Sequence, residues 1–435
     1  MRVLLTGATG FIGGALAGAL AARGHELVLA VRDTAAAARR WPMHASLAVD
    51  FGADHAVADW RPRVDGVDVV VNTVGILREH AGQTFEAIHA RAPVALFRAC
   101  AEAGVGRVVQ LSALGADDDA ASGYHRSKAA ADRELARLPV ASTIVRPSLV
   151  FAPGGTSARW FSMLAALPAT PLPGGGAQCV QPIHLDDLVD ALVTVIESPT
   201  TSFPRRLGSS APPILDAVGP TPLTLHTYLA TLRSALGLPP MRTLPVPRWT
   251  MRIAAAIGSR LGGFVDRDTL DMLERGNCAP AATITRVLGH PPRPVDAFIH
   301  PDQQAPLRQR AQLDWLLPLL RTAVALTWIV TGIVSLWVFP REESLALLAR
   351  TGLHGATAVA ALHVAGFLDI ALGIGTLMKR GRRWSYAAQM LLMLGYTAII
   401  TLWLPEFWWH PYGPVLKNLL LLAATWLLYR LDDGR

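Results

Sequence analysis

Apolar and polar positions alternate along residues 1–150 in two different rhythms. Five short aliphatic and β-branched runs, each bounded by turn residues, predict strands. They lie at residues 3–5, 27–31, 67–71, 107–111 and 142–145. Three stretches between them have apolar positions at helical spacing. They are residues 11–23, 85–103 and 124–138. This alternation predicts an α/β fold with a mainly parallel sheet and right-handed crossovers.

The pattern changes after residue 150. Residues 150–300 are rich in Pro and Gly with helical stretches between, such as 223–236, which predicts a loop-rich second lobe. The prolines of residues 290–312 disfavour regular structure and predict a linker. The domains expected are 1–220, a dinucleotide-type sheet with inserted loops, 221–312, a C-terminal lobe with the linker, and 313–435.

Four apolar segments follow residue 314. They run over residues 316–339, 353–378, 384–404 and 415–429. A membrane-spanning helix needs about 20 apolar residues, which the first three segments reach and the fourth barely approaches. The segments predict an all-α four-helix transmembrane domain, and buried helices of a soluble protein are the alternative.

Loop charges predict the orientation of these helices. Arg308 and Arg310 precede the first segment, and four cations separate the second from the third: Lys379, Arg380, Arg382 and Arg383. The third-to-fourth loop, 405–414, contains Trp408 and Trp409 but no Lys or Arg. Since positive loops stay cytoplasmic, we expect a multi-pass protein of a bacterial-type inner membrane, with its N-terminal domain and C-terminus in the cytoplasm.

Composition supports a lipid-embedded part and excludes two classes of protein. Hydrophobic residues make up 51% and charged residues 17%, with mean hydropathy +0.32, which excludes a disordered chain. The net charge is +7, but the sequence has no stripe of Lys and Arg interleaved with aromatic residues. A nucleic-acid-binding protein is therefore not favoured. Cys100, Cys179 and Cys278 are far apart, odd in number and without metal-ligand spacing. They predict free thiols in a reducing compartment and no metal site.

A glycine-rich turn lies between the first predicted strand and helix. Its glycines follow a GxxGxxG spacing, and they break an apolar N-terminal stretch that would otherwise resemble an export signal. In such a turn the first glycine permits a tight bend, the second lets the backbone approach a pyrophosphate, and the third allows close helix packing. A Rossmann-type dinucleotide site is therefore predicted, with a purely structural turn as the alternative. Its residues are Thr6, Gly7, Thr9, Gly10, Phe11, Ile12 and Gly13.

The end of the second strand bears on the choice of cofactor. Arg32 at the strand tip suits the 2′-phosphate of NADP(H), whereas Asp33 beside it suits the ribose diol of NAD(H). NADP(H) is preferred and NAD(H) stays open, as does a solvated strand-end arginine. Asp50 is a candidate for the adenine edge, with a turn-capping role as its alternative.

A Ser, a Tyr and a Lys follow the predicted strand 107–111. Tyr124 and Lys128, four residues apart, share one helix face, and Ser112 directly follows the strand. An ammonium in this position lowers a phenol's pKa and holds a ribose, the phenol transfers a proton, and the serine orients a carbonyl. The chain has three lysines against 37 arginines, yet Lys128 falls at this spacing. A catalytic trio is predicted, and a solvated helix face is the alternative.

Residues 1–300 resemble the extended or atypical short-chain dehydrogenase/reductases, in particular the branch with the 39-kilodalton accessory subunit of respiratory complex I. The resemblance rests on residues 6–13, 71–75, 111–116, 124–128, 146–148 and 182–187. It implies that Asn72 and Gly75 line the cofactor cleft, that Ser112, Tyr124 and Lys128 are catalytic, and that Tyr124 and Lys128 also contact the cofactor. Asn72 is followed by Thr-Val-Gly rather than Ala-Gly, and that branch holds NADP(H) structurally. Residues 315–435 resemble a DoxX-type four-helix membrane domain.

Several polar residues fall within or near the predicted spans. Asp369 and Arg321 approach the same membrane side, which predicts an Arg321–Asp369 pair between the first two spans. These groups have two interpretations. They either serve packing and anchoring only, or form a proton or quinone site. In the second lobe, His184 and Asp187 are candidates for substrate contact or for hydrogen bonds that stabilise the lobe.

Together these features predict a membrane-anchored NAD(P)(H)-dependent oxidoreductase or epimerase/dehydratase acting on a hydrophobic, membrane-associated or quinone-related substrate. Its expected partners are the lipid bilayer and that substrate. A non-catalytic NADP(H)-binding scaffold or redox sensor docked to a membrane complex is the alternative from another class. A third hypothesis makes the membrane domain the functional part.

Overall fold

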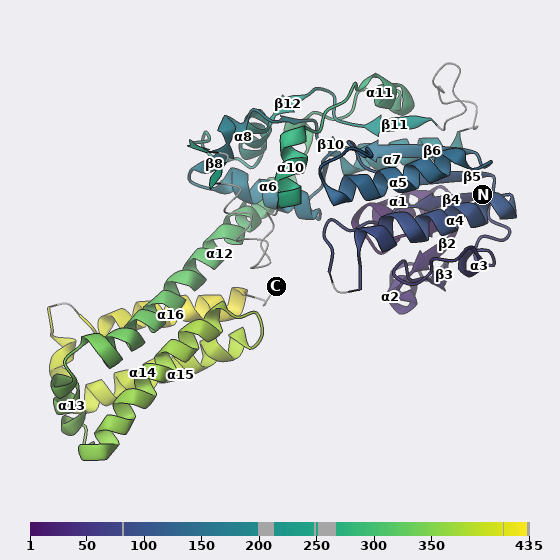
Figure 1. Cartoon of the computed structure of the whole chain (residues 1–435). Coiled ribbons are helices and arrows are strands. Elements are labelled where there is room, and N and C mark those ends of the chain that lie inside the picture. Colours follow the sequence, from purple (N-terminus) through teal and green to yellow (C-terminus); the bar gives the residue numbers. More distant parts are fainter. Residues whose placement is uncertain (81, 199–212, 248, 251–266, 412, 433–435) are drawn as a thin grey trace. The chain divides into compact units, whose positions relative to one another are not determined.

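The computed structural model describes residues 1–80, 82–198, 213–247, 249–250, 267–411 and 413–432 (Figure 1). The chain forms two compact units, residues 1–311 and residues 312–435. Each unit is described by itself below.

A seven-stranded parallel sheet forms the centre of the first unit. Its strands are β1 (Arg2–Thr6), β2 (Glu26–Val31), β3 (Ala45–Ala48), β4 (Val69–Asn72), β5 (Arg107–Leu111), β6 (Ser142–Pro147) and β11 (Ile214–Ala217). They are ordered β11-β6-β5-β4-β1-β2-β3, and every pair is parallel. All five predicted strands are confirmed. The edge strands β3 and β11 were not predicted, because four-residue strands with partly exposed side chains lack a continuous apolar run.

Helices cover both faces of this sheet (Figure 1). One face packs against α1 (Phe11–Ala22), α7 (Leu185–Glu197) and α11 (Ala282–Leu288). The other packs against α3 (Val57–Trp60), α4 (Ala92–Ala103) and α5 (Gly123–Arg137). A separate apolar core lies on each side, so the strands are buried on both faces. This explains their continuous aliphatic sequences.

Short strand pairs and helices form a second lobe within the first unit. The pairs are β7 (Val150–Phe151) with β10 (Ile183–His184), β8 (Thr170–Pro173) with β13 (Thr243–Val246), and β9 (Cys179–Val180) with β12 (Leu223–Thr224). The helices are α6 (Thr156–Ala166), α8 (Leu225–Ala235) and α10 (Arg267–Arg275), joined by the 3₁₀ turns η2 (Gly174–Gly176) and η4 (Val295–Ala297). The predicted helix at residues 223–236 is confirmed as α8.

The expected linker is partly wrong. Residues 301–312 are helical, since they form the start of α12 (Pro301–Ile333). Pro301 occupies the first turn, where its missing N–H has no intrahelical partner. Pro306 removes a single helical hydrogen bond near that end. Two prolines near a helix start are therefore tolerated.

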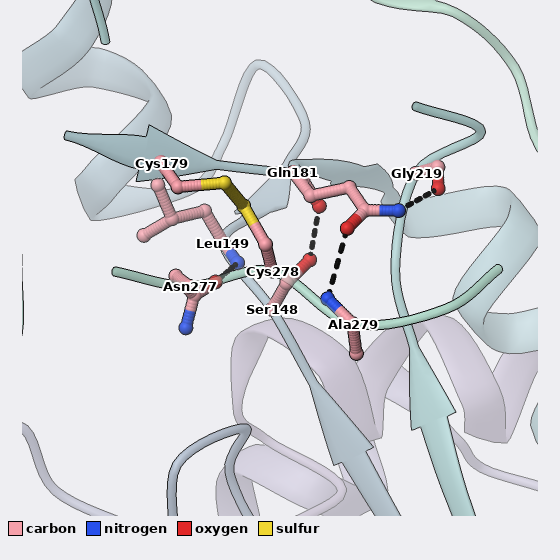
Figure 2. The surroundings of a disulfide bond; sticks show 8 residues. All are labelled: Ser148, Leu149, Cys179, Gln181, Gly219, Asn277, Cys278 and Ala279. Carbon is pink, nitrogen blue, oxygen red and sulfur yellow. Dashed lines mark hydrogen bonds between the residues drawn. A yellow bond between two sulfur atoms is a disulfide. The ribbon is translucent and has the colours of Figure 1, made fainter. Parts of the chain in front are cut away.

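The prediction of three free thiols is wrong for two of the cysteines, so the cysteines do not support the reducing compartment inferred from them. Cys179 and Cys278 form a disulfide with a Cα–Cα distance of 6.1 Å across 99 residues of sequence (Figure 2). Beside it, the Asn277 N–H donates to the Cys179 carbonyl at 2.8 Å. The tertiary fold thus brings together two segments that sequence distance separates. Cys100 is free and buried as expected, and burial raises the pKa of its thiol to about 12.

Polar contacts hold the disulfide segment against the sheet (Figure 2). The Leu149 N–H donates to the Asn277 side chain at 2.9 Å, and the Ala279 N–H donates to Gln181 Oε1 at 3.0 Å. Gln181 in turn donates to the Gly219 carbonyl. The disulfide therefore reinforces a junction that hydrogen bonds already define.

The second unit is a helical bundle. It contains most of α12, continued by a π-helical turn η5 (Val334–Val338), then α13 (Arg341–Arg350), α14 (Gly355–Leu377), α15 (Arg382–Trp403), the 3₁₀ turn η6 (Pro405–Trp408) and α16 (Leu416–Leu431). In the described residues, α12 with η5, α14 and α15 are long and apolar enough to cross a membrane. The helix α16, with 16 residues, is shorter. The four predicted apolar segments thus all form helices, and three reach spanning length.

The predicted Arg321–Asp369 pair is wrong. Arg321 donates to Asp432, at 2.9 Å from Nε and 2.8 Å from Nη2. Asp432 also accepts from Arg382 Nη1 at 3.2 Å and from the Tyr386 hydroxyl at 2.7 Å. Asp432 directly follows α16, at the bundle end where α12 carries Arg321, whereas Asp369 lies in the middle of α14. An arginine near a bundle end pairs with the carboxylate at its own depth.

Candidate functional site

The glycine-rich turn after β1 has the backbone that its sequence predicted. Gly7 has φ of +76°, a left-handed conformation that favours glycine. A Cβ on Gly13 would lie 2.2 Å from the Gly7 carbonyl oxygen, so α1 can pack this closely only with glycine there. Thr6 Oγ1 donates to Asn72 Oδ1 at 2.6 Å, which fixes the turn against β4.

The start of α1 offers free backbone donors to an anion. Gly10 is the N-cap and supplies no side-chain cap, and the first turn contains no acidic residue. The N–H groups of Phe11, Ile12 and Gly13 therefore lack intrahelical acceptors, and the helix dipole adds partial positive charge. Thr9 and Gly10 are exposed at the same place. The glycines leave a space that any side chain at their positions would fill, and the backbone N–H groups beside it have no acceptor. This arrangement fits the pyrophosphate of a dinucleotide.

Basic residues near this turn fit an additional phosphate. Arg32 is exposed directly after β2, and Asp33 caps the following α2 (Thr34–Arg40) by accepting from Ala36 N–H at 2.8 Å. The Arg40 guanidinium lies against α1, since a Cβ on Gly14 would be 2.9 Å from Arg40 Nη2. One sequence candidate for NAD(H), Asp33, is thus engaged with backbone. Arg40 was not found from sequence.

Two further cofactor candidates, Asp50 and Asn72, form hydrogen bonds to other groups of the protein. Asp50 Oδ1 accepts from the Gly52 N–H at 2.8 Å, as a turn-capping residue does. Asn72 is fully buried, and its side chain also donates to Gln110 Oε1 at 2.7 Å. Gly75 lies beside the lysine of the trio, because a Cβ there would be 3.2 Å from Lys128 Nζ.

Ser112 belongs to a buried charged cluster at the end of β5. Its hydroxyl donates to Asp132 Oδ2 at 2.7 Å, and Arg146 donates to the same oxygen at 3.1 Å. Burial raises the pKa of Asp132, and the bonds from Ser112 and Arg146 oppose that rise. Asp132 and Arg146 therefore fix the Ser112 hydroxyl in one orientation. Sequence reasoning missed Asp132, which lies one turn beyond Lys128 on α5.

Tyr124 lies within an aromatic enclosure near the start of α5. The rings of Phe85, His89 and His125 contact it at centroid distances of 6.0, 5.3 and 5.3 Å. Burial raises the pKa of Tyr124 to about 12. The expectation of a lowered phenol pKa is therefore wrong for this arrangement, because burial disfavours the charged phenolate. A phenol that keeps its proton is suited to act as an acid.

Lys128 is buried one turn after Tyr124. Its Nζ donates to the Leu111 carbonyl at 3.1 Å and to the Val74 carbonyl at 3.3 Å. Burial lowers the pKa of Lys128 to about 8, and the negative charge of Asp132 limits this fall. The lysine therefore links the ends of β4 and β5 and is charged at neutral pH.

His89 is a site residue that sequence reasoning missed. It projects from a π-helical segment η1 (Glu86–Arg91) that precedes α4, and such segments are frequent at functional sites. Its Nε2 accepts from the Ile76 N–H at 2.9 Å, and Nδ1 is 3.0 Å from Ser127 Oγ. Burial and the Lys128 charge lower the pKa of His89 to about 2, so its ring is neutral. A histidine within a helical apolar pattern gives no sequence signal for this position.

His184 and Asp187 form hydrogen bonds at the start of α7 and with Arg293. Asp187 accepts from the Arg293 N–H at 2.7 Å, and His184 Nδ1 accepts from the Asp186 N–H at the start of α7. These are the hydrogen bonds that a lobe-stabilising role requires.

The trio and the glycine turn share the carboxyl edge of one parallel sheet. Ser112 follows β5, Gly75 follows β4 and the glycine turn follows β1, three neighbouring strands. Ligands of open α/β sheets bind at this edge, near the switch between β1 and β4. The arrangement can orient a carbonyl, deliver a proton and hold a dinucleotide.

Comparison with known proteins agrees with both units. Residues 3–206 match the NAD dependent epimerase/dehydratase family, and residues 325–426 match the DoxX-like family. A 3-diazoavenalumate denitrifying reductase of a Streptomyces species is 30% identical over 289 residues, 61% of this chain and 88% of that protein.

A second relative covers less of its own length. The mitochondrial subunit 9 of the NADH dehydrogenase [ubiquinone] 1 alpha subcomplex of Arabidopsis thaliana is 29% identical over 221 residues. These are 48% of this chain and 53% of that subunit, so the chain spans about half of this relative. Among solved structures, the NADPH complex of an Escherichia coli NADPH-dependent quinone oxidoreductase has a TM-score of 0.53 at 19% identity. It covers 68% of this chain and 97% of that protein, and it shows the fold alone.

Proposed function

Because this chain belongs to the NAD dependent epimerase/dehydratase family and continues into a DoxX-like membrane unit, we propose that it is an NADP(H)-dependent reductase acting on a lipid-soluble carbonyl compound. The observation that supports the proposal is the position of Ser112 and Lys128 at the ends of β5 and β4, with Tyr124 one turn before Lys128 on α5, at the sheet edge that also carries an uncapped, glycine-lined helix start. Epimerase or dehydratase chemistry uses the same proton-transfer groups and is the alternative reaction.

Each residue of the trio has a separate task. A bound nicotinamide cofactor would supply hydride to the carbonyl carbon, and Tyr124 would protonate the carbonyl oxygen, so that an alcohol forms. Ser112, held by Asp132, fixes the carbonyl oxygen toward the phenol. Lys128 stabilises the tyrosinate that remains and holds the cofactor ribose. General acid catalysis of this kind contributes about 10² to 10⁴ in rate.

The preference for NADP(H) rests on the charges around the glycine turn. Arg32 and Arg40 are cations near the turn, and Asp33 is engaged at the start of α2. Arginine matches phosphate geometry with several donors. NAD(H) would need a carboxylate for its ribose diol at this edge.

The membrane unit supports a lipid-soluble substrate and a cytoplasmic placement of the first unit. Three helices have the length and hydropathy of membrane spans, so the first unit acts next to a bilayer. The cations at Lys379 and Arg380 lie between α14 and α15, on the side expected in the cytoplasm. A reporter fused at residue 381 against one fused in the loop 405–411 tests this orientation.

The test compares three strains: wild type, deletion, and deletion complemented with Tyr124→Phe. Lipids, quinones and small metabolites are measured without preselection, and purified protein is titrated with NADPH by fluorescence. We expect the deletion and Tyr124→Phe strains to accumulate the same compound, while NADPH affinity changes less than about twofold. Tyr228→Phe is the matched control, since Tyr228 is buried in α8 away from the trio.

A scaffold without turnover is the second candidate, favoured by the similarity to a subunit of NADH dehydrogenase. Under that function the deletion changes the metabolite profile or a membrane assembly, and Tyr124→Phe restores the wild-type state. That outcome would contradict the reductase. Absence of NADPH binding by the pure protein would contradict both.

A further inference from the structure

The middle of the membrane unit contains buried polar atoms without partners. Within the described residues, Asp369 Oδ1, Gln389 Oε1 and Trp328 Nε1 are buried and have no hydrogen-bond partner. They come from α14, α15 and α12, the three helices of spanning length. An unpaired polar group in a lipid environment is expensive, so three in one region require an explanation.

Helix packing places these residues in one neighbourhood. On α14, Asp369 lies between Gly366 and Gly373 on the buried face. A Cβ on Gly366 would meet Leu336, and one on Gly373 would lie 2.8 Å from the Ala325 carbonyl oxygen. Asp369 therefore faces the stretch of α12 that contains Trp328.

The third helix closes the same region. Gln389 Nε2 donates to the Leu372 carbonyl at 3.1 Å and to Thr376 Oγ1 at 2.7 Å, so its amide lies one turn from Asp369. Trp328 packs in one apolar cluster with Met393 of α15, and Leu372 packs against that cluster. Asp369 is only 5% exposed and Gln389 is fully buried.

The unused atoms define the chemistry of an occupant. Asp369 Oδ1 and Gln389 Oε1 accept hydrogen bonds, and Trp328 Nε1 donates one. A hydroxyl group both donates and accepts, and an alkyl tail attached to it fits the exposed apolar surface of the helices. We propose that Asp369, Gln389 and Trp328 form a binding site within the membrane unit for the hydroxyl head of a lipid-soluble alcohol.

This site is separate from the one proposed for the trio. It lies in the second unit, and its assignment requires neither NADP(H) binding nor turnover by Tyr124. Arg321 and Arg382 do not neutralise Asp369, because both bond to Asp432. A hydrogen-bonding ligand therefore has no charged competitor among the described contacts of Asp369.

Photolabelling in nanodiscs tests the proposal on the full-length protein. The probe is dodecanol carrying a diazirine and an alkyne, and its matched control is the methyl ether of the same probe, which cannot donate. We expect the alcohol to label peptides of α12, α14 or α15 near Trp328, Asp369 or Gln389 about tenfold more strongly than the ether, since a bond to a buried carboxylate is worth about that factor. Excess unlabelled dodecanol should suppress the labelling.

Variants decide whether the polar atoms are responsible. Asp369→Leu and Gln389→Met should each reduce labelling by the alcohol to the level of the ether. Thr425→Val is the matched control, because Thr425 is equally buried but bonds to the Leu421 carbonyl of its own helix. Gel filtration and circular dichroism identify variants that fold. Equal labelling by alcohol and ether, or labelling that both folded variants retain, overturns the proposal and leaves ordered water as the occupant.

Discussion

The two units differ in how many hydrogen-bond partners their buried charged side chains have. In the first unit, Lys128 bonds to two backbone carbonyls, and Asp132 accepts from Ser112 and Arg146. In the second unit, Asp432 accepts from three side-chain donors at the bundle end, whereas no described side chain donates to Asp369 at its middle. Loops at a sheet edge supply partners from many directions, but adjacent apolar helices supply few. Depth in the bundle therefore separates a structural charge from one available to a ligand.

The two units also differ in covalent cross-linking, because all three cysteines lie in the first unit. The largest stability effect is therefore expected from removing the Cys179–Cys278 disulfide. Replacing Cys179 and Cys278 together by Ser should destabilise residues 1–311 by about 4–5 kcal/mol, because the disulfide closes a loop of 99 residues. Pulse proteolysis in urea on the full-length protein measures this. Dithiothreitol should shift the wild type by the same amount and leave the double variant unchanged; an unshifted wild type would show that the thiols are free.

The next effect tests the network at the bundle end. Asp432→Asn leaves Arg321 and Arg382 without their carboxylate, which should destabilise the second unit by about 3 kcal/mol. Asp369→Asn, which removes no ion pair, should change stability by less than about 1 kcal/mol. Thermal unfolding in detergent measures both, with exposed Asp302→Asn as control. Equal losses for Asp432→Asn and Asp369→Asn would break the contrast between bundle end and middle.

A smaller, pH-dependent effect comes from Lys128. Its folded pKa of about 8 lies below the ordinary 10.5, so the folded state binds fewer protons between these values. The penalty of the buried charge is full below pH 8 and is lost toward pH 10.5, so stability rises with pH. From pH 7.5 to 9.5 the wild type should gain about 2 kcal/mol relative to Lys128→Met.

Urea titrations at several pH values, scored by proteolysis of residues 1–311, give this slope. Lys379→Met, which removes an exposed lysine, should keep the wild-type slope. If the free energy of unfolding changes equally with pH in the wild type and in Lys128→Met, the pKa of Lys128 is not lowered by folding.

The smallest effect concerns the cofactor. Arg40→Ala should weaken NADPH about tenfold, or about 1.4 kcal/mol, and leave NADH affinity unchanged, because only NADPH carries the extra phosphate. Arg39→Ala, on the same helix α2, is the matched control. Isothermal titration with both cofactors measures the difference. Equal weakening of NADPH and NADH would place Arg40 at the shared pyrophosphate.

Sequence periodicity determined the parts of this protein that depend on local physics. Strands buried on both faces must be aliphatic, so β1, β2, β4, β5 and β6 were predictable, and so were the glycine turn and the helical stretches after residue 314. A strand end and a four-residue helical spacing predicted where Ser112, Tyr124 and Lys128 lie along β5 and α5, and their catalytic roles stay a prediction. Edge strands β3 and β11 lack such a pattern, since short and partly exposed strands need no apolar run.

Tertiary structure alone decided the contacts between distant segments. The Cys179–Cys278 bond, the placement of His89 beside Tyr124, and the choice of Asp432 as the partner of Arg321 join residues 99, 35 and 111 positions apart. A sequence states that a charge or thiol exists, but its partner depends on which loops and helix ends the fold brings to the same depth. For that physical reason the fold class followed from the sequence, the trio stays a prediction, and the disulfide and the bundle-end network could not be predicted.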